Sequence, residues 1–122
     1  FIPPLPIDYD STLNCYKSMM EMEGMGPHVT ENFPKAQAIK DATMAHFILK
    51  NWSPEKMLIH YHGSYHSENF ESIYWYLKKA NPELNIVTIH TVSQGDVSEL
   101  EEENIGLADF TICVDENMTK TR

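Results

Sequence analysis

A short, largely apolar run at residues 57–62 ends directly in Gly63, and a helical pattern follows it at once. Apolar runs of this length that end in glycine are typical of buried strands in parallel sheets. Ser67 can cap the helix that follows, which should run to Asn81, and residues 85–91 form a second apolar run. Strand, helix and strand within about forty residues form a right-handed crossover with parallel strands. The sequence therefore predicts an α/β fold.

One further strand is predicted near the C-terminus. Residues 108–114 form another short apolar run, and the strongly acidic stretch at 98–104 should be a solvated turn or a short helix. Three strands make a small sheet. We expect this sheet to be parallel or mixed and to be flanked by helices.

The N-terminal half begins with an extended arm at residues 1–10, because Pro3, Pro4 and Pro6 fix φ and remove backbone donors. Residues 11–122 are expected to form a single α/β domain. Its first helix begins at a cap supplied by Asp10 or Ser11 and runs to about residue 23, where two glycines end it.

A longer helix is predicted from residues 30–34 to Asn51 or Trp52. Asn32 can accept a first-turn N–H, and Pro34 supplies the preset φ of a first helical position. Residues of one stripe recur at helical spacing in this segment: Ala38, Ala42, Ala45, Leu49 and Trp52. Ser53 and Pro54 should end the helix.

Length and charge limit the functions that are open to the chain. With 122 residues and 42% hydrophobic content it can form one core. A net charge of −9 and a single arginine, Arg122, argue against nucleic acid, an anionic membrane surface or a phosphate ligand. No run is apolar and long enough to span a bilayer, so we expect this chain to be soluble. Cys15 and Cys113 can form one disulfide or none.

Residues 34–45 resemble the Q-x-x-x-D-x-x-M-A helix of ChaN-like haem-binding proteins, with Gln37, Asp41, Met44 and Ala45 at the motif positions. Residues 59–66 are similar to the strand that leads into the family's Gly-x-x-His loop, and residues 73–77 to the segment after it. The resemblance covers roughly residues 30–92.

The resemblance implies an α/β scaffold shared with iron-regulated lipoproteins and with Tiki-type and erythromycin-esterase-type hydrolases. It implies haem as the cofactor and iron uptake as the function. It also implies a parent protein of the cell envelope, in the periplasm or lipid-anchored at the outer membrane. The family's first-strand Gly-Glu does not precede Pro34, and the sequence begins with Phe1. We therefore expect the C-terminal portion of a larger, truncated domain.

The loop Gly63-Ser64-Tyr65-His66 is the main candidate site. Ligands in parallel sheets bind beyond the carboxyl ends of the strands, where His66 would lie. Imidazole is both a metal ligand and a proton carrier near neutral pH, and Tyr65 and Glu68 are close enough to orient or supplement it. The alternative is that His66 caps the next helix or packs within the loop.

Gln37 and Asp41 lie one helical turn apart, so one helix can direct both into a cleft with Met44 below them. The alternative is a local hydrogen-bonded pair or a solvated edge. His60 and His62 share one face of the predicted strand and, with His66, are candidate ligands for a divalent metal. The alternative is that both are hydrogen-bonded histidines of the core or its rim.

Soft ligands and axial haem ligands have several candidates. A methionine cluster can supply thioethers or adaptable core packing: Met19, Met20, Met22 and Met25. An axial ligand can come from the histidines or from the tyrosines, namely Tyr61, Tyr65, Tyr74 and Tyr76. The sequence does not select among them.

Three functions follow from these features: a ChaN-like haem or iron-uptake protein, a metal-assisted hydrolase on the same scaffold, and a fragment with an incomplete site. We expect a binding protein rather than an enzyme. A truncated sheet leaves an edge without a partner strand, which favours self-association. We therefore expect a homo-oligomer, with residues 1–10 reaching a second copy.

Overall fold

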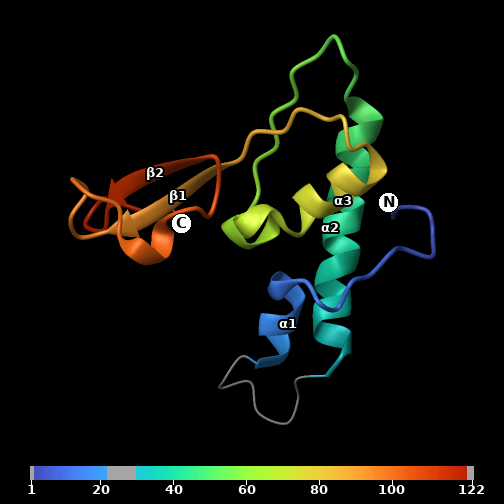
Figure 1. The fold of residues 1–122 in the computed structure, drawn as a ribbon, viewed down its shortest axis with the longest axis horizontal. Coiled ribbons are helices and arrows are strands. Elements are labelled where there is room, and N and C mark those ends of the chain that lie inside the picture. The colour runs from blue at the N-terminus through green and yellow to red at the C-terminus, as the bar shows by residue number, and fades with distance from the viewer. Residues whose placement is uncertain (1, 22–29, 121–122) are drawn as a thin grey trace.

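The computed structural model describes residues 2–21 and 30–120. Three α-helices lie in this part of the chain: α1 (Asn14–Glu21), α2 (Asn32–Asn51) and α3 (Ile73–Ala80). Short 3-10 helices accompany them: η2 (Ser64–His66), η3 (Glu68–Phe70) and η4 (Glu102–Asn104). The strands β1 (Ile89–Gln94) and β2 (Phe110–Asp115) form a parallel sheet to one side of the helices (Figure 1). The predicted α/β class is confirmed.

Helix α2 is the centre of the helical part, and both α1 and α3 pack against it (Figure 1). Its small side chains Ala38, Ala42 and Ala45 are buried, which allows the neighbouring helices to approach closely. The predicted extent of this helix is therefore confirmed, and the remaining members of the predicted stripe, Leu49 and Trp52, are partly buried. Asn32 is the first helical residue instead of the cap, and no side chain caps the helix.

Helix α1 begins later than predicted, because Asp10 Oδ1 accepts the N–H of Thr12 and forms a turn before it. The first helical N–H groups are bound from a distant segment, since the Glu71 carboxylate accepts those of Asn14 and Cys15. The glycines expected to end this helix, like Met22 and Met25, lie outside the described residues.

The N-terminal arm lacks regular structure, as predicted, but it packs against its own chain. Ile7 and Tyr9 join a cluster with Tyr16 and Ala38, which covers part of α1 and α2. Tyr76 on α3 donates its hydroxyl hydrogen to the carbonyl oxygen of Asp8 at 2.7 Å. The arm is thus held by apolar contacts and a hydrogen bond within one chain, and the expectation that it reaches a second copy stays a prediction.

The strand predicted at residues 57–62 is not formed. This segment is an extended connection, and Met57, Ile59 and Tyr61 are 92%, 68% and 89% exposed. A buried strand needs a neighbour that accepts and donates its backbone hydrogen bonds, and β1 pairs with β2 instead. The predicted crossover from this segment to the next strand, and a sheet of three strands, are therefore wrong for the described residues.

The helix predicted to begin at Ser67 begins instead at Ile73. Asn69, Phe70 and Ser72 have φ values of 57°, 59° and 55°, which no α-helix can contain. The chain therefore forms η2 and η3 first, and Ser67 does not act as a side-chain cap. Ile73 and Leu77, which lie one turn apart on this helix, are buried.

The parallel pairing of β1 and β2 runs from Ile89 opposite Phe110 to Gln94 opposite Asp115. Both strands begin and end further along the chain than predicted, β1 by four residues at its start. The Gln94 side chain is buried and holds the connection between the strands, since its Nε2 donates to the carbonyl oxygens of Asp96 and Glu99 at 2.5 and 2.6 Å.

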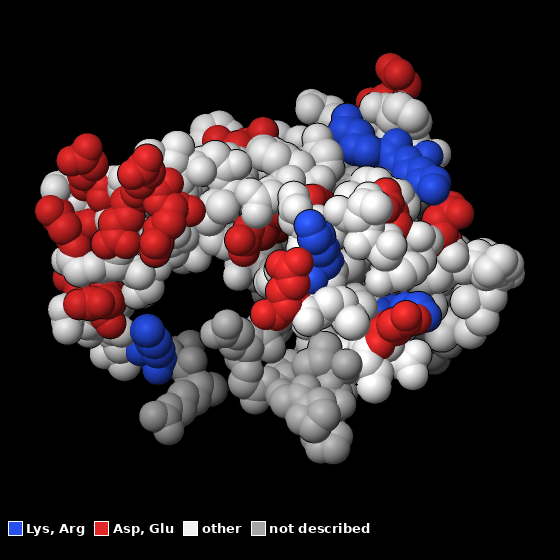
Figure 2. Space-filling model, turned by 60° about the horizontal axis from the view of Figure 1, so that its bottom comes forward, with Lys and Arg blue, Asp and Glu red and all other residues white. Residues whose placement is uncertain are grey.

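Charged residues are distributed unequally between the sheet and the helical part of the molecule. No lysine or arginine occurs between Lys79 and Lys120, whereas the acidic residues of that stretch gather around the sheet (Figure 2). The other lysines lie on or beside the helices (Figure 2). Among residues 2–21 and 30–120 we find no helix with the length and apolar character needed to cross a membrane.

Candidate functional site

His66 is the last residue of η2, and its ring faces α2. Its Nδ1 lies 2.5 Å from Oδ1 of Asp41, and the two side chains are 21% and 0% exposed. Asp41 lies in the middle of α2, where the packed helices remove it from water. A fully buried carboxylate requires hydrogen-bond donors, and the His66 ring is one of them.

Tyr16 of α1 is the second donor to this carboxylate. Its hydroxyl donates to Oδ2 of Asp41 at 2.8 Å, and the tyrosine is 1% exposed. Asp41 therefore accepts on both oxygens, from α1 on one side and from the His66 loop on the other. Tyr16 was not among the site residues predicted from the sequence. The one available signal was that a buried tyrosine hydroxyl needs a partner.

Gln37, one turn before Asp41 on α2, also contacts the His66 ring. Its Nε2 lies 2.9 Å from Nδ1 and 3.4 Å from Nε2 of that ring. The spacing argument therefore brought the right residues together, since Gln37, Asp41 and His66 form one cluster. Their role in binding a ligand stays a prediction.

Burial sets the electrostatics of this cluster. It raises the pKa of Asp41, and the hydrogen bonds from His66 and Tyr16 oppose that rise. Burial also raises the pKa of Tyr16, and the neighbouring Asp41 raises it further, so this hydroxyl keeps its proton. At His62, burial and then the neighbouring His60 and His66 lower the pKa.

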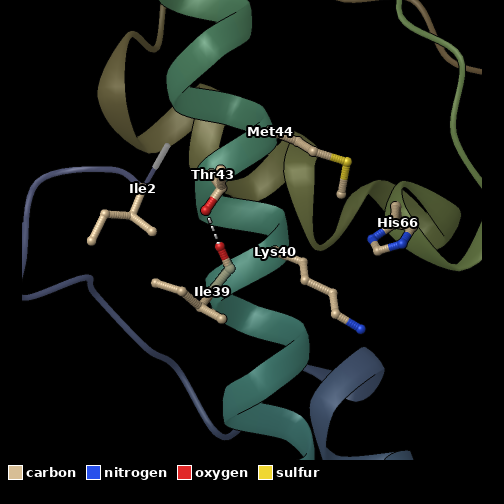
Figure 3. Close-up of a pocket in the computed structure, with 6 residues that line it drawn as sticks. All are labelled: Ile2, Ile39, Lys40, Thr43, Met44 and His66. Carbon is tan, nitrogen blue, oxygen red and sulfur yellow. Dashed lines mark hydrogen bonds between the residues drawn. The ribbon is translucent and has the colours of Figure 1, made fainter.

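A pocket of about 500 Å³ lies over α2, between the N-terminal arm and the His66 loop (Figure 3). Met44 and Lys40 extend from α2 toward the side on which His66 lies, and Ile2 faces Ile39 on the other side (Figure 3). The lining is mostly apolar, with one imidazole and one ammonium group: Ile2, Ile39, Lys40, Thr43, Met44 and His66.

The remaining residues predicted for this site lie outside the pocket. The Tyr65 hydroxyl donates to the carbonyl oxygen of Cys15 at 2.6 Å and lies 2.8 Å from Ser18 Oγ, so it fastens the loop to α1. Glu68 lies in η3 and does not line the pocket. Cys15 and Cys113 are both free thiols.

His60 and His62 contact each other on the exposed connection, with their Nδ1 atoms 2.9 Å apart. His62 Nε2 lies 2.8 Å from Ser67 Oγ, and the ring centroids of His62 and His66 are 6.3 Å apart. Within the described part of the chain, no three His, Cys, Asp or Glu side chains are grouped so that they could hold a metal ion. His60, His62 and His66 are thus not grouped as a three-ligand set in this structure, and their role as metal ligands stays a prediction. The two described methionines of the predicted cluster differ in burial, since Met19 is buried and Met20 is exposed.

The family described as haem-binding uptake, Tiki superfamily, ChaN matches residues 2–77. The matched stretch includes α1, α2 and the His66 loop, so it contains the whole Tyr16–Asp41–His66 cluster and every residue of the pocket. The chain belongs to this ChaN-type family of haem-binding proteins. No curated protein and no solved structure gives a significant match.

Proposed function

We propose that this chain binds haem in the pocket over α2, with His66 as the group that faces the iron. The observation that carries the proposal is the position of His66, whose ring is held by the buried Asp41 at the wall of an apolar pocket. The family match supports haem as the ligand, because the pocket lies within the matched residues.

The residues of the pocket fit the chemistry of haem. A haem site needs an axial donor, an apolar slot and a polar rim for the propionates. His66 supplies an imidazole and Met44 a thioether, Ile2 and Ile39 supply apolar surface, and the Lys40 ammonium suits a propionate. A volume of about 500 Å³ is within the usual range for small-molecule sites. Bound haem would supply an iron centre that the side chains alone do not provide.

The proposal extends to haem or iron uptake in the cell envelope. In support, the family description names haem-binding uptake, a role that suits a parent protein in the periplasm or, by a lipid anchor, at the outer membrane. We further propose that the chain is part of a larger ChaN-like domain and self-associates through its sheet. In support, Phe110 and Ile112 are 63% and 51% exposed on one face of β2. Light scattering that gives a strict monomer over a wide concentration range would count against self-association.

Haem titration followed by absorbance tests the proposal. Wild-type protein should shift the Soret band with saturable binding, and His66→Ala should abolish or strongly weaken that shift. His46→Ala is the matched control, because His46 lies on the same helix α2 and does not line the pocket. A Soret shift that survives in His66→Ala and is lost in Tyr65→Phe would move the site to the tyrosine and overturn the assignment of His66.

A hydrolase is the second candidate, and the Asp41–His66 pair favours it. A carboxylate at Nδ1, with only a weak 3.4 Å contact from the Gln37 amide at Nε2, is the arrangement of a general base. Ester hydrolysis that is lost in His66→Ala, in a protein that gives no Soret shift, would favour this candidate. Silence in both assays would favour a fragment whose site is incomplete.

A further inference from the structure

We propose that Asp41 and Tyr16 are positioning residues, which hold His66 in the tautomer with the proton on Nδ1 and thereby present the Nε2 lone pair to the pocket. The proposal depends on the proposed function only for the identity of the ligand. The tautomer itself is a property of the ligand-free protein.

The hydrogen-bond pattern assigns the proton. Oδ2 of Asp41 accepts from the Tyr16 hydroxyl at 2.8 Å, which leaves Oδ1 to accept from the His66 ring at 2.5 Å. Both hydrogen bonds lower the pKa of Asp41 against the effect of burial and so favour its ionised form. An ionised carboxylate has no hydrogen to give, so the ring nitrogen that faces it is the donor. In a neutral imidazole the other nitrogen then carries the lone pair.

Gln37 competes for the same nitrogen, since its Nε2 lies 2.9 Å from Nδ1 and would need Nδ1 as an acceptor. The contact with Asp41 Oδ1 is shorter, at 2.5 Å, and joins the ring to a fully buried carboxylate, so it decides the assignment. The same amide lies 3.4 Å from Nε2, the nitrogen that can accept from it. At that length the interaction is weak, and a ligand that binds Nε2 displaces only a weak donor.

Tyr16 is needed because the carboxylate is out of water. Asp41 is 0% exposed, and a buried carboxylate held by one donor alone leaves acceptor capacity unsatisfied. The Tyr16 hydroxyl satisfies the second oxygen, so the charge of Asp41 remains available to His66. Through this bond the first helix, α1, contributes to a site that otherwise lies on α2 and the His66 loop.

The arrangement favours an electrophilic ligand at Nε2. A carboxylate that accepts from one ring nitrogen makes the other a stronger donor toward a metal centre, and the loss of such a partner typically costs about 10–100-fold in metal affinity. For the ligand proposed above, Asp41→Asn should weaken ferric haem binding by about that factor, since a neutral amide no longer strengthens the imidazole.

Nitrogen NMR of the ligand-free protein labelled with [15N]histidine tests the tautomer directly. The His66 signals, assigned by their loss in His66→Gln, should show Nδ1 as protonated and Nε2 as unprotonated. Asp41→Asn should change the proportion of the two tautomers, and Tyr16→Phe should shift the ring signals in the same direction by less. His46 is the internal control, because it lies outside the cluster and its signals should not move.

The wild-type spectrum alone can overturn the proposal, so it does not depend on the folding of a variant. His66 protonated on Nε2 in the wild-type protein would contradict it, as would ring signals that are unchanged in a folded Asp41→Asn. The predicted tautomer in a protein that does not bind haem would contradict the proposed ligand and leave the positioning role intact. The two failures are thus distinguishable.

Discussion

Glu71 accepts the backbone N–H of Cys15 through Oε2 at 2.6 Å, and Oε1 of the same carboxylate accepts that of Asn14 at 3.1 Å. A side chain more than fifty residues away in sequence thereby caps the N-terminus of α1. The negative charge also suits the positive end of the helix. Because α1 carries Tyr16, this cap helps to place the hydroxyl that reaches Asp41.

Removal of the cap should destabilise the protein. Glu71→Ala leaves two N–H groups at the start of α1 without their partner, and we expect the free energy of unfolding to fall by about 1–2 kcal/mol. Urea denaturation measures the change. Glu83→Ala is the control, since Glu83 is an exposed residue after α3 and should change stability by less than about 0.5 kcal/mol. Equal effects of the two substitutions would argue against the cap.

The Tyr16–Asp41 bond should also contribute to stability. Asp41→Ala leaves the Tyr16 hydroxyl buried without a partner, at a cost of about 1–3 kcal/mol. In a double-mutant cycle with Tyr16→Phe, the two substitutions together should cost less than the sum of their separate effects. Strict additivity would show that the two side chains do not interact in solution.

The pKa of Cys15 gives a test by alkylation. Burial raises the pKa of this thiol to about 11, so at pH 8 only about one molecule in a thousand carries the reactive thiolate. We expect iodoacetamide at pH 8 to label the half-buried Cys113 before Cys15, and the rate at Cys15 to rise as the pH approaches 11. Mass spectrometry of the digested protein measures both sites. Rapid labelling of Cys15 at pH 8 would be incompatible with its burial at the start of α1.

Substitutions in the connection at residues 57–62 distinguish an exposed segment from a buried strand. Ile59→Ser should change the free energy of unfolding by less than about 0.5 kcal/mol, because the side chain is 68% exposed. Leu77→Ala on α3, where the leucine is 6% exposed, should cost about 2–5 kcal/mol. If Ile59→Ser lowered the free energy of unfolding by several kcal/mol, the result would support the buried strand predicted from the sequence.

The sequence predicted those features that depend on local patterns. Helix α2 follows from the spacing of its alanines together with Pro34 near its start, and both signals lie within one segment. The convergence of Gln37 and Asp41 follows from one turn of the same helix. Family membership could be predicted as well, because the motif residues lie close together in the chain.

Features that depend on distant partners were not predictable from these patterns. The run at residues 57–62 has the composition of a strand, but composition does not tell which other strand pairs with it. Tyr16 lies 25 residues from Asp41, and Glu71 lies 56 from Cys15, so no local spacing connects them. The positive φ values of Asn69, Phe70 and Ser72 could not be predicted from residue type either, because none of these residues is glycine.

Electron-nuclear double resonance of the ferric haem complex, prepared with [15N]histidine, tests the role of His66 most directly. We predict a strongly coupled 15N nucleus from an axial imidazole in the wild-type protein and in His46→Ala, and its absence in His66→Ala. A coupling that persists in His66→Ala, or a wild-type complex without any axial histidine coupling, would contradict haem ligation by His66.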